Sequence, residues 1–512
     1  MTKEKTKITI HPKGERELRI KKAVLVETFG GRIHVEWDSE GAVTPLGQLP
    51  FFVEFLKTAE LFEPWITECP LEYESPNAPS KRDILGTILL SVLGGHRRYA
   101  HISAIRADGV NPELLGMKKT ASEDSVRRAF KDADEGRCGR WQSDHLTRCY
   151  AALLCEPWIL DIDTTVKPLY GHQEGAVVGF NPRKPGRPSH VYHTYLMANT
   201  RLVLDVEVQA GNRTASKYSR PGLFAFLDSL DRSLWPEFLR GDCGFGNEDT
   251  IRESEERGLP YLFKLRQTRK VRRLLEKMFT EGEWEPAGGG YEGVEAKLKL
   301  TGWTRERRVI ILRREIRDEV AMKNVSNGQQ ELMFIETLET VRTYEYVVLV
   351  TSLRDGILSI AQHYRDRADA ENAFDELKNQ WGWNGFTTKD LKRCRIMARN
   401  VALIYNWWSL FVRLAVPHKH AEAITSRPLL LHAVAKQTSH AGQTHLTITS
   451  THAKASSVQR ILRSLVSFFR SVRKSAEQLN WQERWRIILS RIFVHFLGGR
   501  LLRTQKLLSF SP

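Results

Sequence analysis

Residues 363–381, HYRDRADAENAFDELKNQW, place a row of charged side chains beside an apolar helical face. At about 100° per residue on a helix, Arg367, Glu371 and Lys378 project within roughly a 40° arc. An exposed helix can carry such a row as a salt-bridge ladder of slight stabilising effect. The alternative is a carboxylate flanked by two cations for a functional reason. The rest of the sequence decides between these interpretations.

Two aspartate-bearing segments lie where strands are expected to end. In residues 157–171, PWILDIDTTVKPLYG, the alternation of side chains predicts a strand with Asp161 and Asp163 on one face. Carboxylates on an otherwise apolar strand are costly unless they bind something positive. In residues 238–247, FLRGDCGFGN, Asp242 follows a short strand and enters a glycine-rich turn. Taken alone, Asp242 is better explained as a turn or helix-capping aspartate.

Asp163, Asp242 and Glu371 together have the chemistry of a two-metal site for phosphoryl transfer. Hard divalent cations take oxygen ligands, and two of them about 3.5–4 Å apart hold the attacking and leaving oxygens of an in-line displacement. The six cysteines contain no CxxC pair, which disfavours zinc. The residues therefore predict two Mg²⁺ ions per site, with Mn²⁺ as the other candidate.

With these segments the chain resembles a known family, the bacterial insertion-sequence DDE transposases with a ribonuclease-H-like core. The resemblance covers roughly residues 90–410. It is carried by DIDTT around Asp163, GHQEGAVVGFNP at 171–182, QAGNRTAS at 209–216, GDCGFGN around Asp242, and the tyrosine-arginine-glutamate-lysine (YREK) signature Tyr364-x2-Arg367-x3-Glu371-x6-Lys378. Single pieces of this kind are weak signals, but the ordered set with its helical spacing is specific.

The resemblance implies roles for these residues. Asp163, Asp242 and Glu371 are expected to be the catalytic metal ligands. Tyr364, Arg367 and Lys378 are expected to bind phosphates at the end of the transposable DNA element, near the scissile bond. The implied reaction is metal-dependent strand cleavage at terminal inverted repeats and strand transfer into target DNA, by a homodimer in a synaptic complex.

Two details depart from the family pattern. Asp161 duplicates a carboxylate beside Asp163, and the threonine that directly follows Asp163 favours Asp163 as the ligand. In some relatives a tryptophan stacks on a flipped base, and Trp284 and Trp303 are the candidates for that role here.

The expected fold class is α/β, a ribonuclease-H-like core interrupted by a β-rich insertion and flanked by helical DNA-binding regions. Strand-like segments between residues 283 and 353, one of them at 331–339, predict the insertion. The expected organisation is a β-rich segment at 1–45, a helical DNA-end-binding domain at 46–150, core at 151–282, β-rich insertion at 283–353, the glutamate helix of the core at 354–415, and a basic helical region at 416–512.

The charge of the chain agrees with a nucleic-acid partner. Its formal net charge is +16, and the segment from Lys454 to the end holds 12 Lys and Arg against two Glu. Aromatic residues at helical spacing indicate that this tail folds, while a concentrated positive patch is typical of proteins that bind phosphate backbones. A second candidate is residues 114–130, LLGMKKTASEDSVRRAF, which fit either a helix-turn-helix or a helix that only packs.

The sequence has no apolar run of membrane-spanning length, and its charged start resembles no export signal. Scattered cysteines without a disulfide framework fit a reducing compartment. A bacterial cytoplasm, with the protein associated with the nucleoid, is therefore expected. Two other functions remain open at this stage: a domesticated DNA-binding protein that does not cut, and a structure-selective nuclease that nicks DNA without joining ends.

Overall fold

The computed structural model describes residues 24–38, 41–73, 75, 77–213, 215–316, 343–418, 420–449 and 453–503. The chain divides into two compact units, Met1–Ala42 and Val43–Pro512. In the first unit an antiparallel hairpin is formed by β1 (Val24–Thr28) and β2 (Gly31–Val35). The remainder of the expected β-rich segment before residue 24, and the strand expected at 331–339, lie outside the described residues.

The second unit begins with a layer of helices. Several start at side chains that accept a hydrogen bond from the first turn, as Ser80 does from the Asp83 N–H and Asp134 from the Arg137 N–H. The helices are α1 (Leu49–Thr58), α2 (Phe62–Thr67), α3 (Lys81–Leu93), α4 (Ile102–Ile105), α5 (Asn111–Leu114), α6 (Glu123–Arg128) and α7 (Glu135–Tyr150). α1, α3 and α7 contact the long and almost fully buried α15 (Leu391–Ala415), and Trp65 of α2 lies edge-on to Trp407 with ring centroids 5.3 Å apart.

One mixed sheet organises the rest of the second unit. Its strands within the described residues are β4 (Ile159–Pro168), β5 (Val177–Val178), β6 (Pro188–Met197), β7 (Leu202–Ala210), β8 (Phe238–Gly241), β9 (Tyr261–Lys264), β10 (Glu285–Gly288), β11 (Tyr291–Leu298), β12 (Arg307–Ile316) and β13 (Thr343–Thr351). β4, β8 and β9 are parallel neighbours, whereas β6 runs antiparallel to β4 and pairs on its other side with β7 and β5.

The strands after residue 284 continue this sheet. β13 pairs antiparallel with β9, and β12, β11 and β10 follow in antiparallel order. The insertion thus shares hydrogen bonds with the central strands. The helices between the strands are α8 (Ala215–Tyr218), α9 (Arg220–Asp228), α10 (Glu248–Glu256) and α11 (Arg269–Glu281).

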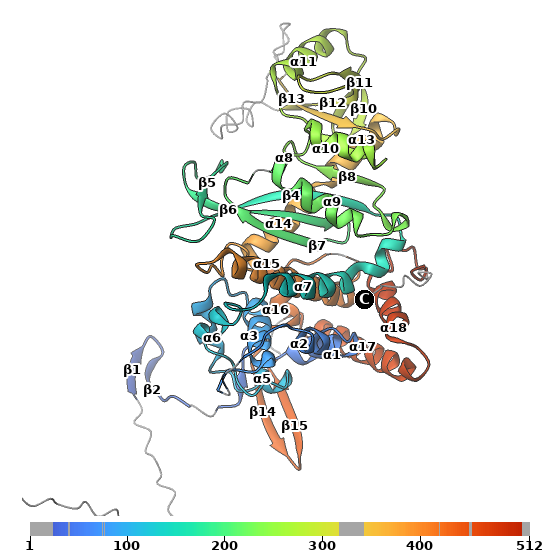
Figure 1. Ribbon diagram of the computed structural model, residues 1–512. Helices are drawn as coiled ribbons and strands as arrows, with labels where there is room; N and C mark the ends of the chain where they lie inside the picture. The colour runs from blue at the N-terminus through green and yellow to red at the C-terminus, as the bar shows by residue number, and fades with distance from the viewer. Residues whose placement is uncertain are drawn as a thin grey trace, which may run out of the picture. The chain divides into compact units, whose positions relative to one another are not determined.

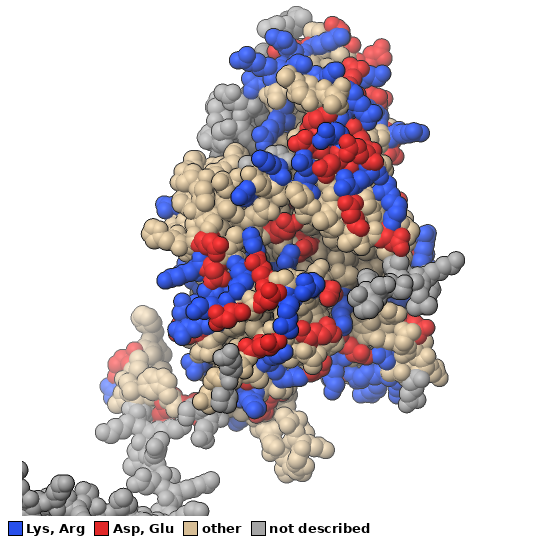
Figure 2. Space-filling view, in the orientation of Figure 1, with Lys and Arg blue, Asp and Glu red and all other residues tan. Residues whose placement is uncertain are grey.

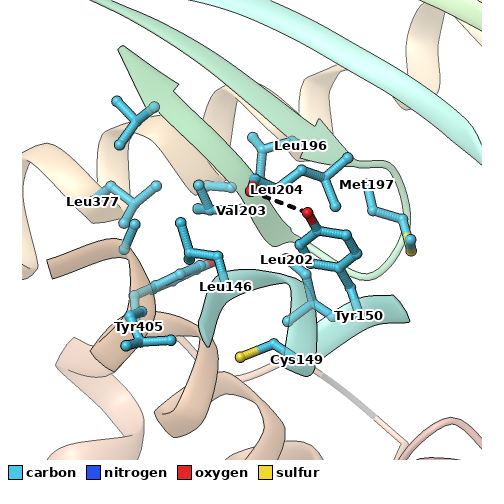
Figure 3. Close-up of a cluster of buried hydrophobic side chains, with 14 of the residues drawn as sticks. Leu146, Cys149, Tyr150, Leu196, Met197, Leu202, Val203, Leu204, Leu377 and Tyr405 are labelled. Carbon is cyan, nitrogen blue, oxygen red and sulfur yellow. Dashed lines mark hydrogen bonds between the residues drawn. The ribbon is translucent and has the colours of Figure 1, made fainter. Parts of the chain in front are cut away.

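After β13 the chain forms α13 (Ile357–Asp366) and α14 (Ala368–Gln380), which precede α15. Figure 1 shows α7 and α15 together below β7, in agreement with their contacts. In Figure 3, Leu146 of α7, Leu377 of α14 and Tyr405 of α15 meet Val203 and Leu204 of β7 in one buried cluster. The apolar face of residues 363–381 therefore anchors α14 in the core.

The C-terminal part contains α16 (Ala423–Leu430), α17 (Ala455–Lys474) and α18 (Trp481–Ile492). It also contains a hairpin of β14 (Ala435–His440) and β15 (Gln443–Ile448), joined on the side of β14 by β3 (Val43–Thr44). This hairpin differs from the helical structure expected for 416–512. Positive φ at Ala441 (50°) and Gly442 (74°) allows a two-residue turn. Threonine-rich alternation suits the strands.

The tail packs against the rest of the unit: α17 and α18 both contact α15, and α17 also contacts α1. Phe469 and Trp485 are buried there, which confirms the expectation of a folded tail. Among the described residues, no helix is long and apolar enough to cross a membrane.

Candidate active site

The two central aspartates lie side by side on neighbouring strands. β4 and β8 are parallel, and their last paired residues are Ile162 and Gly241. Asp163 and Asp242 directly follow these two residues in the sequence. Because paired strands lie about 4.8 Å apart, the backbones of the two aspartates are close together. The sequence expectation that both aspartates end strands is wrong for Asp163. β4 continues to Pro168, because β6 supplies hydrogen bonds to this half of the strand after β8 has ended.

Asp242 begins a tight turn. Its Oδ1 accepts a hydrogen bond from the Gly244 N–H at 2.8 Å, and its carbonyl accepts one from the Phe245 N–H at 3.1 Å. The turn role favoured for Asp242 in isolation is therefore real. Within the described chain the other carboxylate oxygen, Oδ2, accepts no hydrogen bond, so the turn leaves one oxygen of Asp242 available as a ligand.

The signature residues are on two helices rather than one. Residues 363–381 form the end of α13 and all of α14, with a break at Arg367. The backbone of Arg367 stays right-handed helical, with φ −62° and ψ −22°, and its carbonyl still accepts a hydrogen bond from the Glu371 N–H at 3.3 Å. The break therefore leaves the four-residue spacing of Arg367 and Glu371 intact.

Arg367 connects the helix to the strands. Its guanidinium donates to the Glu371 carboxylate and lies 3.6 Å from Asp163 Oδ1. The Arg367 side chain is only 10% exposed, whereas that of Glu371 is 61% exposed. The ladder pair expected on an exposed helix does exist. Its arginine, however, is buried and shared with the central aspartate, so the surface-ladder interpretation fails for Arg367.

The electrostatics of Asp163 distinguish it from an ordinary carboxylate. Burial raises its pKa to about 6, and the negative charge of Asp242 acts in the same direction. Arg367 and Lys378 oppose this shift. A carboxylate held against a like charge in a partly buried site favours the approach of additional positive charge.

Asp161 has a different environment, although it shares a strand face with Asp163. Arg240, its partner across β4 and β8, donates from Nε and Nη2 to the two Asp161 oxygens at 2.6 and 2.8 Å. Both side chains are 2% exposed, and Arg240 also donates to the carbonyl of His363 in α13. The expectation that an aspartate on this strand must bind something positive is met here by arginine, which occupies both oxygens of Asp161.

The remaining signature residues lie around this centre in different ways. Lys378 is half-buried; burial lowers the pKa of its ammonium group, Asp163 opposes that shift, and Arg183 adds to it. Tyr364 is in α13 and packs against the buried cluster that contains Phe238 and Ile360. The spacing of the signature does not indicate that the tyrosine ring packs against the core.

The donor set suits a hard divalent cation. Asp163, Asp242 and Glu371 present oxygen atoms, and the first two are neighbours on parallel strands. In the part of the chain that the structure describes, no group of three His, Cys, Asp or Glu side chains converges as metal ligands. The third carboxylate, Glu371, is instead held by Arg367, which joins it to Asp163.

The other candidates from the sequence make contacts within the fold. Trp303 is buried, with the Arg307 guanidinium 5.0 Å from its ring, and the Arg313 guanidinium lies 4.0 Å from the ring of Trp284. The α6 helix has only six residues, and the carbonyl of Arg127 accepts a hydrogen bond from Arg393. The structure therefore shows a packing contact of α6, while its exposed Arg127 and Arg128 leave the DNA-reading role a prediction.

Arg240 and Arg183 are the neighbours of the site that the motifs did not reveal. The only sequence signal for Arg240 is its place directly before Gly241 and Asp242, opposite a strand with two aspartates. Arg183 belongs to a basic run, 183–187, after the GHQEGAVVGFNP segment. Neither residue can be connected to the site without the pairing of distant segments.

Comparison with known proteins gives a matching family and similar solved structures. The family described as "Transposase DDE domain group 1" matches residues 74–468. No curated protein matches the chain. A cryo-EM structure of the piggyBac transposase synaptic complex with hairpin DNA is 11% identical, with a TM-score of 0.39 over 88% of this chain and 85% of that chain.

Proposed function

The chain belongs to the group 1 family of transposase DDE domains, and on this premise we propose that it is a cut-and-paste DNA transposase of a bacterial insertion sequence. It would cleave DNA strands at the element's terminal inverted repeats and transfer the ends into target DNA. We also infer that β4, β6, β7, β8 and β9 form a ribonuclease-H-like core. The strand order β7-β6-β4-β8-β9, antiparallel in its first half and parallel in its second, supports that inference.

The observation that carries the proposal is the neighbouring pair Asp163 and Asp242, with Arg367 joining Asp163 to Glu371. We assign all three carboxylates as the ligands of two Mg²⁺ or Mn²⁺ ions. When bound, such ions activate water or a DNA 3′-hydroxyl and stabilise the leaving oxygen. The raised pKa of Asp163 is consistent with a site designed to take up positive charge.

The chain's own cations would orient the substrate. Arg367 can hold a phosphate oxygen through its planar fork while keeping Asp163 and Glu371 in place. Lys378 would supply a point charge for a second oxygen. Tyr364, from the neighbouring helix, would contact the DNA through its hydroxyl, with its ring fixed by packing. Holding the scissile phosphate in the reacting geometry raises the rate of strand cleavage, because a displacement of about 1 Å can lower that rate on the order of 100-fold.

Double-stranded DNA would also bind along α17. Arg460, Arg463, Arg470 and Lys474 project from the side opposite the buried stripe of this helix, and all four are exposed. Within the described chain none of them has an acidic partner, and Figure 2 shows Lys and Arg gathered over this part of the surface. Such a row neutralises phosphates without reading sequence. A homodimer on paired ends, in a bacterial cytoplasm with its nucleoid, completes the proposal.

The test is a strand-transfer assay with the inverted repeats that bracket the gene. Purified protein, labelled repeat ends and a target plasmid are incubated with Mg²⁺, and joined products are mapped by sequencing. Repeat-specific joining is expected. Nicking without joining would replace the proposal with a structure-selective nuclease, and binding without either reaction would indicate a domesticated DNA-binding protein.

A further inference from the structure

The loop between β4 and β6, residues 169–187, contains the GHQEGAVVGFNP segment, to which the proposed chemistry assigns no role. It exposes large side chains: Phe180 is 74% exposed, Tyr170 69% and Val178 53%. In Figure 1 this loop, with β5, stands out at the edge of the sheet. Phe180 makes no ring contact within the described chain. A cluster of exposed large apolar side chains usually marks a surface that meets a partner.

Glycines hold this loop in place. A Cβ atom on Gly179 would lie 1.8 Å from the Gly211 carbonyl oxygen, and one on Gly211 would lie 2.2 Å from the Val177 carbonyl oxygen. The Gly211 N–H also donates to the carbonyl of Gly175, which has a φ of +73°. The two glycine motifs of the sequence, at 171–182 and 209–216, are therefore packed backbone to backbone. This packing fixes the segment that presents Phe180.

The charge around Phe180 is positive. Arg183, Lys184 and Arg187 are exposed, and within the described residues none of them has an acidic partner. Lys184 and Arg187 lie 5.2 and 4.9 Å from the centre of the Tyr170 ring. The acid of this loop, Glu174, is used internally, where it accepts a hydrogen bond from the Leu391 N–H at 3.0 Å.

The loop is connected in sequence and charge to the elements of the proposed site. It begins directly after β4, the strand that carries Asp163. At the other side, Arg183 lies near enough to Lys378 to lower the pKa of that ammonium group, and Lys378 in turn is near Asp163. The charge of Arg183 therefore acts on the signature lysine, while Lys184 and Arg187 gather at the ring of Tyr170.

We propose that loop 169–187 is a platform for an unpaired nucleotide at the DNA end, on which Phe180 stacks against the base while Arg183 and Arg187 hold the flanking phosphates. This rests on the proposed function, because it takes DNA as the substrate. Bases within a duplex are already stacked on one another, so a free ring finds a partner only where a base is unpaired. Stacking of this kind tolerates any base, and the cations bind the backbone.

The experiment measures binding of the full chain to two fluorescein-labelled probes by anisotropy: a blunt duplex, and the same duplex with a single-stranded thymidine tail on either strand. The wild type should bind a tailed probe on the order of tenfold more tightly than the blunt one. Phe180→Ala should abolish this preference, and Phe180→Trp should keep it. Phe496→Ala, which removes another ring that is 44% exposed, serves as the matched control and should behave as the wild type.

Stability is measured alongside, and Phe180→Ala should melt as the wild type does. An equal tail preference in wild type and Phe180→Ala would overturn the proposal. So would a change in the sedimentation of the DNA-free protein in Phe180→Ala, which would assign the ring to a protein contact. A wild type that joins ends with Mg²⁺ but shows no tail preference would refute the platform alone. Conversely, a tail preference that depends on Phe180 in a protein without joining activity would support the platform and refute the proposed reaction.

Discussion

Asp161 and Asp163 are two residues apart on one face of β4, yet their replacement should have opposite effects on stability. Asp161 is fully paired: Arg240 donates to both of its oxygens, and both side chains are 2% exposed. Asp161→Ala would leave the buried Arg240 charge with the His363 carbonyl as its remaining partner. Removing one partner of a buried pair costs about 3–5 kcal/mol, because the other charge stays desolvated.

The assay is denaturant unfolding at pH 8 without divalent ions, with single-turnover cleavage measured per folded molecule at low temperature. Asp161→Ala should lose several kcal/mol of unfolding free energy while its cleavage per folded molecule remains close to that of the wild type. The double variant Asp161→Leu with Arg240→Met is the matched control, because replacing both charges with apolar groups is often neutral or stabilising. It should recover most of the loss.

Two results would refute this reasoning. A stability of Asp161→Ala equal to that of the wild type would mean that the pair contributes nothing to the fold. A cleavage defect in Asp161→Ala as deep as that of Asp163→Ala, at equal folded fraction, would mean that Asp161 takes part in chemistry. The second result would remove Asp163 as the first ligand.

Three further predictions concern the neighbouring charges. Because the pKa of Asp163 is about 6 in the fold and about 4 in an unfolded chain, the folded protein binds the extra proton between these values and gains stability as pH falls through that window. Metal-free Asp163→Asn should therefore be more stable than the wild type at pH 8, by up to about 3 kcal/mol, and equal to it at pH 3; a constant difference in denaturant titrations would contradict this. Lys378→Ala should slow single-turnover cleavage by on the order of 100-fold without a change in melting temperature, whereas a ladder lysine would leave the rate unaltered. Replacing Arg460, Arg463 and Arg470 by Gln should reduce the slope of log affinity against log salt concentration by up to about 0.9 for each replacement. A slope equal to that of the wild type would assign the phosphate contacts to other residues.

Local patterns were sufficient to predict several of the elements that carry the candidate site residues. Alternation predicted β4, and the pattern before Asp242 predicted the short strand β8. The helical face of residues 363–381 predicted that α14 packs on one side. These features depend on period and spacing within a few residues, which a single sequence carries.

Features that depend on long-range pairing were not predicted. The partner of Asp161 is set by the register between β4 and β8, 79 residues apart at Arg240, and no local pattern encodes it. The extension of β4 beyond Asp163 depends on β6, and the continuation of the sheet through β13 depends on its pairing with β9. The hairpin β14–β15 is mostly polar, and its apolar residues are limited to Ala435, Leu446 and Ile448, which is too weak a pattern to recognise it.

The packing of the tail also changes how its DNA-binding role can be tested. Phe469 of α17 and Trp485 of α18 are buried against the rest of the unit. Truncation before Lys454 would therefore expose apolar surface and destabilise the fold, in addition to removing positive charge. Charge-neutralising substitutions on the exposed side of α17 separate these effects, which a truncation cannot do.

The most direct test of the central claim is single-turnover cleavage of a pre-bound repeat end by Asp242→Asn, with and without Mg²⁺. Asparagine keeps the Oδ1 that accepts the Gly244 N–H, so the turn and DNA binding should be preserved. If Asp242 is a metal ligand beside Asp163, the wild type cleaves only with Mg²⁺, and the variant binds the same end but loses cleavage by orders of magnitude. Wild-type cleavage by Asp242→Asn, or cleavage by the wild type in excess chelator, would contradict the account.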